Sequence, residues 1–327
     1  MKRRGGSGGG VVDELQAALA EGLQGRYAIE DLLGTGGMAL VFSARDLARN
    51  RPVAIKVLNP EIASAVTTAR FVREVLWSAT LQHPHIVPLL DSGEASGFPY
   101  LVMPLVEGEA LGSRLAAHGK LPVATAVKFA TEVALALDYA HGRGVVHRDI
   151  KPDNILLSHE YALVADFGVA RALGVASGNT LTGPGSPIGT LAYMSPEQVL
   201  GHPDVDGRTD IFSLGCVTYE MLAGRRAFNG TTLREIMEQQ MNYEPPPLAT
   251  LRADVPPAVA AAVMRAIDKD PARRHQTARD FALALGGSVP SPFVPEPPAP
   301  RLQTGLWLLI AAVIAVVVLS ATLLLHR

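Results

Sequence analysis

The chain has 327 residues, 48% of them hydrophobic, and a formal net charge of −2. This length suffices for one large domain or two lobes with buried cores. The near-neutral charge argues against nucleic acid as the main partner, because binding to its backbone normally needs a strong basic patch. The single cysteine, Cys216, excludes an internal disulfide, and its apolar surroundings, IFSLGCVTYEML, predict a small buried hydrophobe.

Residues 1–26 precede the region that we expect to fold as one unit. The start, MKRRGGSGGG, has a basic cluster without an apolar segment after it, so we interpret it as a flexible arm and not as a signal peptide. The stretch DELQAALAEGL has the pattern of an amphipathic helix. A basic arm followed by one short helix is therefore predicted here.

Residues 27–106 consist of short runs in which apolar and polar residues alternate. The runs RYAIEDLLG, ALVFSARD, PVAIKVLN and PYLVMPLV predict strands, and ARFVREVLWSATL predicts one inserted helix. Residues 107–286 show helical periodicity instead, for example in PVATAVKFATEVALALDYAHGRG. The predicted fold class is α+β, with a small β-rich lobe before a larger α-helical lobe.

The chain changes character after residue 286. Residues 287–304 are rich in proline and are predicted to form an extended spacer. Residues 305–325 carry no charge and are long enough to cross a hydrocarbon core of roughly 30 Å. We expect one transmembrane helix here, with residues 326–327 as a short tail beyond it and no folded sensor outside the cell.

The stretch VVHRDIKPDNILL brings three kinds of functional side chain close together. Asp149 is placed to accept a proton, Lys151 to neutralise an anion, and Asn154 to offer a carbonyl oxygen to a hard cation. Asp166 follows in VADFGVA at the end of an apolar strand, where an acid could hold magnesium. Singly, either aspartate fits a turn or a helix cap equally well. Together, these residues suit a hydroxyl group attacking a phosphate.

Residues 27–286 resemble the protein kinase family, specifically the eukaryotic-like (Hanks-type) Ser/Thr kinases of bacteria. HRDIKPDN resembles the catalytic loop, which implies Asp149 as the catalytic base, Lys151 as a contact of the transferred phosphate and Asn154 as a metal ligand. DFG resembles the magnesium-binding motif and implies Asp166 as a second metal ligand. The resemblance implies a bilobal protein kinase fold.

The nucleotide phosphates are assigned to two further motifs by the same resemblance. VAIK supplies Lys56 for the α- and β-phosphates, and Glu74 in RFVREV is its implied ion-pair partner. GTGGMALVF resembles the glycine-rich loop, although Ala39 stands where the family has its third glycine. The implied ATP contacts in this loop are Gly34, Thr35, Gly36, Gly37 and Met38.

The adenine site is assigned to YLVMPLVEG, which resembles the hinge between the lobes. The resemblance implies Met103 as the gatekeeper and Val106 as a backbone contact of adenine. Pro104 replaces the usual acidic residue, but it keeps the carbonyl on which that position depends. Three apolar residues are implied to sandwich the base, although they fit a core role equally well: Val41, Ala54 and Leu156.

Substrate class and regulation follow from residues near the catalytic loop. In the family, Lys151 together with Thr190 in GTLAYMSPE marks kinases that act on serine and threonine. Arg148 places a cation just before the catalytic base, where a phosphate on the activation segment would neutralise and order it. We expect Thr180 or Thr182 to carry that phosphate.

Two contacts are expected to hold the helical lobe together. SPE stands where the family usually has APE, and its Glu197 is expected to pair with Arg274. Asp210, in the helix that contains DIFSLG, is expected to anchor the backbone of the catalytic loop.

The resemblance thus implies an ATP-dependent Ser/Thr protein kinase that uses Mg²⁺, with Mn²⁺ as an alternative metal. Its expected partners are ATP, proteins with serine or threonine, and the lipid bilayer. We expect a single-pass protein of the cell membrane with the catalytic domain in the cytoplasm, where ATP is, and the C-terminus outside. Ala311 and Ala315 form a small-xxx-small pair, which makes a homodimer a hypothesis.

Two other functional classes remain open on the sequence. A pseudokinase scaffold would keep the fold without the chemistry, and a small-molecule phosphotransferase would use a related fold on another substrate. The first conflicts with the presence of every catalytic residue named above. The second conflicts with the lysine of HRDIKPDN and with the SPE segment, which such enzymes typically lack.

Overall fold

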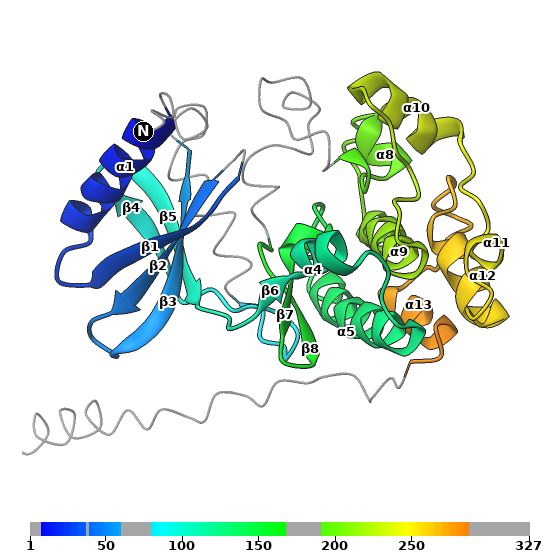
Figure 1. Cartoon of the computed structure of the whole chain (residues 1–327), viewed down its shortest axis with the longest axis horizontal. Helices are drawn as coiled ribbons and strands as arrows, with labels where there is room; N and C mark the ends of the chain where they lie inside the picture. Colours follow the sequence, from blue (N-terminus) through cyan, green and yellow to red (C-terminus); the bar gives the residue numbers. More distant parts are fainter. Residues whose placement is uncertain (1–7, 37–38, 60–79, 168–190, 288–327) are drawn as a thin grey trace, which may run out of the picture. The chain divides into compact units, whose positions relative to one another are not determined.

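The structure is a computed structural model that describes residues 8–36, 39–59, 80–167 and 191–287. All of them belong to the unit Met1–Pro292. A five-stranded sheet with helix α1 comes first along the chain, and a helical part with a small three-stranded sheet follows (Figure 1). The predicted order of a sheet-rich lobe and a helical lobe is confirmed.

The first sheet is antiparallel and has the strand order β1-β2-β3-β5-β4. A two-residue turn at Ser96 and Gly97 connects β4 to β5, and both residues have positive φ, 50° and 84°. Such turns match the right-handed twist of paired strands. The strands are β1 (Tyr27–Thr35), β2 (Ala39–Asp46), β3 (Arg51–Leu58), β4 (Asp91–Ala95) and β5 (Phe98–Pro104).

Helix α1 (Gly8–Gly22) covers one face of this sheet. Leu15, Leu19 and the following Leu23 are only 3%, 0% and 1% exposed. Their four-residue spacing places them on one side of a helix, as an apolar stripe requires. They pack in one cluster with Phe42 and Ile55 of the sheet. The helix predicted in this region is therefore confirmed, but it begins at Gly8, inside the predicted arm. It also belongs to the core of the sheet-rich lobe and does not merely precede the folded unit, as predicted.

The packing of α1 makes Leu19 a test of this arrangement. Replacing Leu19 by Ala should lower the free energy of unfolding by about 2–5 kcal/mol, because it leaves a cavity at a fully buried site. Urea unfolding followed by circular dichroism measures the change. Glu21→Ala, on the exposed side of the same helix, is the control. Equal stability of the two variants would contradict the packing of α1 on the sheet.

The opposite face of the sheet carries four of the predicted nucleotide-site residues. Val41 faces Lys56 across the β2–β3 pair, and Ala54 faces Met103 across the β3–β5 pair. Cross-strand partners project to the same side, and residues two apart on one strand share a face. All four residues therefore lie on one face, while Ile55 between them points to the α1 side.

The helical part is built around α5 (Val123–His141) and α9 (Gly207–Ala223), which pack against each other. Cys216 of α9 is buried, as predicted. The second sheet has the order β6-β7-β8, with β6 (Glu109–Ala110), β7 (Ile155–Ser158) and β8 (Tyr161–Val164). The remaining helices are α4 (Leu111–His118), α8 (Pro196–Val199), α10 (Leu233–Asn242), α11 (Leu248–Leu251), α12 (Pro257–Ala266) and α13 (Ala278–Ala284).

Some predicted segments lie outside the described residues. They are the transmembrane helix at 305–325, the spacer at 287–304 apart from Gly287, and most of the inserted helix near ARFVREVLWSATL. Among the helices that the structure describes, none combines the length and the apolar character needed to cross a membrane.

Candidate active site

Lys56 lies in the middle of β3 and makes a direct contact with the helical part. Its Nζ lies 2.6 Å from Oδ2 of Asp166, and each side chain is 17% exposed. The contact joins residues 110 positions apart in the sequence. Glu74, the predicted ion-pair partner of Lys56, lies outside the described residues, within which Lys56 pairs with Asp166.

Asp166 follows strand β8 in an uncommon backbone conformation. Its φ is 67°, in the left-handed region that few residues other than glycine adopt and that aspartate tolerates better than most. Burial raises the pKa of this carboxyl, but the charge and hydrogen bond of Lys56 outweigh burial, so the pKa is lowered overall. The charge of Lys151 acts in the same direction. The carboxylate is therefore anionic at neutral pH and suited to face a cation.

Lys151 and Asn154 both contact the side chain of Asp149. Nζ of Lys151 lies 2.8 Å and Nδ2 of Asn154 lies 2.9 Å from Oδ2 of Asp149. Nδ2 of Asn154 also donates to the backbone oxygen of Asp149 at 2.8 Å. The 3₁₀ turn at Pro152–Asn154 brings Asn154 back toward Asp149, and proline suits its first position because no N–H is needed there. The three predicted residues thus form one cluster.

His147 links this cluster to the segment that carries Asp166. Its ring is fully buried, with Nε2 lying 2.8 Å from the oxygen of Ala165 and Nδ1 accepting from the N–H of Asp149 at 3.2 Å. Only the tautomer with the proton on Nε2 satisfies both contacts. The N–H of Ala165 also donates to the oxygen of Asn154 at 2.9 Å. Asp149 and Asp166 are therefore held by neighbouring, hydrogen-bonded segments.

Asp210 of α9 holds the backbone just before the cluster around Asp149. It is fully buried and accepts from the N–H groups of His147 at 2.8 Å and Arg148 at 2.7 Å. Nε2 of His141, at the end of α5, lies 2.8 Å from the same carboxylate. Burial raises the pKa of Asp210, but the bond from His141 and the surrounding donors lower it overall. The predicted anchoring role of Asp210 is confirmed.

The glycine-rich loop is described only in part. Gly34 and Thr35 pair with β2, and the N–H of Gly36 donates to the oxygen of Ala39 at 2.8 Å. Ala39, at the position of the missing third glycine, is buried and belongs to the regular β2–β3 ladder. Gly37 and Met38 lie outside the described residues. An alanine at this position is thus compatible with the strand pairing on both sides.

The predicted adenine contacts lie on three segments. Val41, Ala54 and Met103 share the face of the first sheet that also carries Lys56. Val106 follows β5 and is half-buried. Leu156 belongs to β7, where it alternates with the buried Ile155 and Leu157 and is itself half-buried. The strand pairing relates Val41, Ala54 and Met103 to one another. Among the described residues, no contact joins Val106 or Leu156 to these three.

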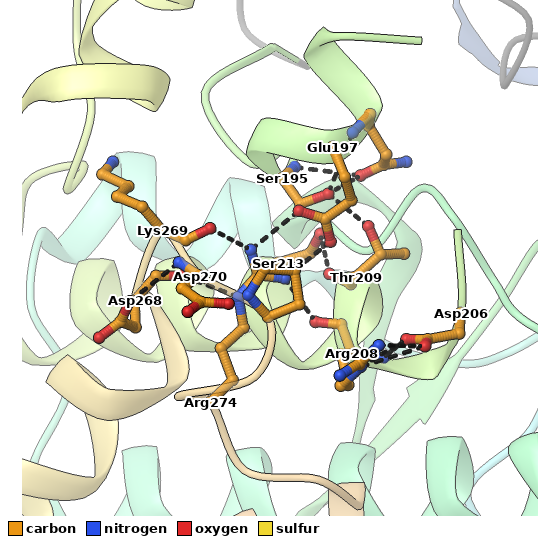
Figure 2. A network of polar contacts seen from close by, with 12 residues as sticks. Ser195, Glu197, Asp206, Arg208, Thr209, Ser213, Asp268, Lys269, Asp270 and Arg274 are labelled. Atoms are coloured by element: carbon orange, nitrogen blue, oxygen red, sulfur yellow. Dashed lines mark hydrogen bonds and ion pairs between the residues drawn. The ribbon is translucent and has the colours of Figure 1, made fainter. Parts of the chain in front are cut away.

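Glu197, a residue of α8, forms a bidentate ion pair with Arg274. Nη1 and Nη2 of Arg274 lie 2.7 Å and 2.8 Å from the two carboxylate oxygens of Glu197 (Figure 2). Arg274 is fully buried, and backbone oxygens of Arg208, Asp268 and Lys269 accept its remaining hydrogens. Burial raises the pKa of Glu197, but the bond and charge of Arg274 lower it overall. This predicted pair is confirmed.

Comparison with known proteins decides the family. A model of the protein kinase domain matches residues 27–281, which include both sheets and nearly all the helical part. The chain belongs to the protein kinase family. Serine/threonine-protein kinase PknB of Mycolicibacterium smegmatis is 40% identical over 269 residues, which are 80% of this chain and 43% of that protein.

Further relatives of this kinase are also bacterial. Serine/threonine-protein kinases PknB and PknD of Mycobacterium tuberculosis are each 39% identical and match 80% of the chain. The match covers 43% of PknB and 39% of PknD. The kinase therefore spans less than half the length of the curated relatives that it matches. The predicted kinase fold, with its sheet lobe and helical lobe, is confirmed.

Two residues of this site, Asp166 and Asn154, offer oxygen donors that could hold a metal ion. Among the described residues, no group of three or more His, Cys, Asp or Glu side chains could hold a metal. Asp166 offers a carboxylate, and Asn154 directs its nitrogen at Asp149 so that its oxygen remains as a donor. Mg²⁺ commonly takes one or two protein oxygens together with phosphates and water. The donors present fit this ion.

Several functional contacts of the kinase were not predicted. His141 holds the segment before Asp149 from a position without a recognisable local signal, whereas His147 is the first residue of the HRDIKPDN motif and so had one. Gln198 donates from Nε2 to the oxygen of Arg148 at 2.8 Å and forms a capping box with Ser195 at the start of α8. The sequence SPEQ contains the capping-box spacing, so this contact had a signal. Of the residues predicted to regulate activity, Arg148 is described, whereas Thr180 and Thr182 lie outside the described residues, as does Thr190, the predicted marker of the substrate class.

Proposed function

We propose that this chain is a Ser/Thr protein kinase that transfers the γ-phosphoryl group of ATP to protein hydroxyls. The observation that carries the proposal is the cluster of Lys151 and Asn154 on Asp149, joined through His147 to the Lys56–Asp166 pair. This is the set of a base, two cations and oxygen donors that phosphoryl transfer needs. The names of the relatives support the choice of serine and threonine.

Each side chain has a separate task in the proposed reaction. Asp149 accepts the proton of the attacking hydroxyl, and Lys151 neutralises charge on the transferred group. Lys56 contacts the α- and β-phosphates. Asp166 and Asn154 would hold Mg²⁺, which supplies positive charge to the phosphates when bound. Because hydrogen bonds already hold these side chains in place, the reaction needs little rearrangement of the protein.

Phosphorylation of a generic protein distinguishes this proposal from its two rivals. The purified chain is incubated with ATP, Mg²⁺ and casein, and products are mapped by mass spectrometry. Phosphoserine or phosphothreonine on casein or on the chain itself supports a protein kinase. Nucleotide binding without any product would indicate a pseudokinase, and phosphate only on small molecules would indicate a small-molecule phosphotransferase.

Activation by autophosphorylation is proposed for Thr180 or Thr182. A phosphate there would dock onto Arg148 through charge-assisted hydrogen bonds and order the activation segment. The double Thr→Ala variant should therefore lose activity severalfold in a casein assay, while Ser177→Ala serves as the control. Unchanged activity, with the phosphate mapped to other hydroxyls, would show that different residues are used.

We also propose that residues 305–325 anchor this kinase in the cell membrane with its catalytic domain in the cytoplasm. The full chain should sediment with membranes and resist extraction by high salt, because burial of apolar side chains in lipid does not depend on ionic strength. The chain shortened after Gly286 should be found in the supernatant with its activity retained. Full-length protein in the soluble fraction without detergent would refute the anchor. Digestion of the catalytic domain by protease outside intact cells would refute the orientation.

A further inference from the structure

Arg148, the residue directly before Asp149, has a strained backbone conformation. Its φ is 69°, in the left-handed region that residues other than glycine, asparagine and aspartate rarely adopt. Such a conformation costs free energy and persists only where the surrounding structure holds it in place. The contacts that hold the backbone of Arg148 therefore decide the direction in which Asp149 projects.

The peptide group between Arg148 and Asp149 is held at both of its ends. Its oxygen, the carbonyl of Arg148, accepts a hydrogen bond from Nε2 of Gln198 at 2.8 Å. Its N–H, that of Asp149, donates to Nδ1 of His147 at 3.2 Å. The N–H of Arg148 itself donates to Asp210 at 2.7 Å. Rotation of this peptide plane would relieve the strain but would break the contacts with Gln198 and His147.

The amide group of Gln198 has a fixed orientation on α8. Its Oε1 accepts from the N–H of Ser195 at 3.1 Å, so its Nε2 is left as the donor. The hydroxyl of Ser195 contacts that of Thr209 in α9, and the neighbouring Glu197 pairs with the buried Arg274 (Figure 2). These contacts hold α8 in place. Gln198 is therefore a donor whose position does not depend on the strained segment that it contacts.

We propose that Gln198 is a positioning residue for phosphoryl transfer, which keeps Asp149 directed at the attacking hydroxyl by holding the carbonyl of Arg148. The inference rests on the proposed function, in which Asp149 accepts the proton of that hydroxyl. A proton acceptor must lie within hydrogen-bond reach of the group that it deprotonates. A small rotation of the peptide before Asp149 would therefore slow the chemical step without changing the site of the nucleotide phosphates.

The test uses the full-length protein with Gln198→Glu and, separately, Gln198→Met. A glutamate still accepts from the N–H of Ser195 and keeps the capping box, but it cannot donate to the carbonyl of Arg148. Methionine removes the donor without adding a charge. We expect kcat for casein phosphorylation to fall roughly 10–100-fold in both variants, as misplacement of a reacting group does. The KM for ATP should stay within about twofold of the wild-type value.

Asp280→Ala is the control for a loss of helix capping. Asp280 occupies the third position of the capping box of α13, as Gln198 does in α8, and it is exposed. This variant should melt at a lower temperature than the wild type but should keep its kcat. A loss of kcat in the Gln198 variants is then attributable to the contact with Arg148 and not to a weaker helix start.

A double variant separates positioning from a merely structural role. If Gln198 acts through Asp149, Gln198→Met should cause no further loss of rate in a protein that already carries Asp149→Asn. A structural role would lower the rate by the same factor in both backgrounds. That outcome, or a wild-type kcat in either Gln198 variant, would overturn this inference and leave the proposed function intact. A wild-type chain that transfers no phosphate would overturn both.

Discussion

Replacing Asp149 by Asn should lower the turnover of phosphoryl transfer by roughly 10²–10⁴-fold, the usual contribution of a general base. Asn keeps the size of the side chain but cannot accept the proton of the attacking hydroxyl. It still accepts hydrogen bonds from Lys151 and Asn154 through its carbonyl oxygen, so the cluster should stay folded. The measurement is initial-rate transfer of labelled phosphate from ATP to casein.

Asp153→Asn is the matched control for this experiment. Asp153 belongs to the same 3₁₀ turn but is exposed, and the change again replaces one carboxylate by an amide. We expect Asp153→Asn to retain most of the turnover and both variants to keep ATP binding and the wild-type melting temperature. Near-normal turnover of Asp149→Asn would remove Asp149 from the proposed catalytic role.

Replacing Glu197 by Ala should lower the free energy of unfolding by about 3–5 kcal/mol, as expected when a buried ion pair loses one partner. Arg274 is fully buried, so its charge would remain in the interior without a compensating carboxylate. Urea unfolding measures the loss. Asp254→Ala is the control, because Asp254 pairs with Arg252 at 2.8 Å but is 65% exposed, and its removal should cost far less.

The effect of Glu197→Ala should also depend on pH. The pKa of Glu197 is lowered in the folded protein, so its contribution to stability is present above its unfolded pKa of about 4.3. That contribution is lost as the pH falls through the lower, folded pKa. The stability difference between wild type and Glu197→Ala should therefore shrink below about pH 4. A difference that stays constant down to pH 3 would mean that the ion pair does not stabilise the fold.

The sequence predicted the parts of the site that short motifs encode. Asp149, Lys151 and Asn154 lie within six residues of one another, and the 3₁₀ turn at Pro152–Asn154 brings them together, so their clustering follows from local geometry. The pairing of Glu197 with Arg274 and the role of Asp210 were also predicted, but only through resemblance to a family. Spacing alone could not reveal them, since 77 residues separate Glu197 from Arg274.

Other features depend on packing that no local pattern encodes. His141 reaches Asp210 across 69 residues because α5 ends where α9 begins its first turn. The leucines of α1 predicted a helix with one apolar side, but not which surface covers that side. Phe42 and Ile55 lie in strands with buried residues on both faces, so the sequence does not mark which face meets α1. Only the folded chain shows that these two apolar surfaces are complementary.

Helix α1 affects where the functional domain should be considered to begin. The family match starts at residue 27, whereas α1 ends at Gly22. A protein shortened to the matched residues would keep every proposed catalytic group but would lose Leu15, Leu19 and Leu23. The apolar side of its sheet would then face water, and exposed apolar surfaces of this kind promote association between molecules. The N-terminal boundary of this domain is thus set by the need to cover the apolar face of the sheet, and not by the position of the proposed catalytic groups.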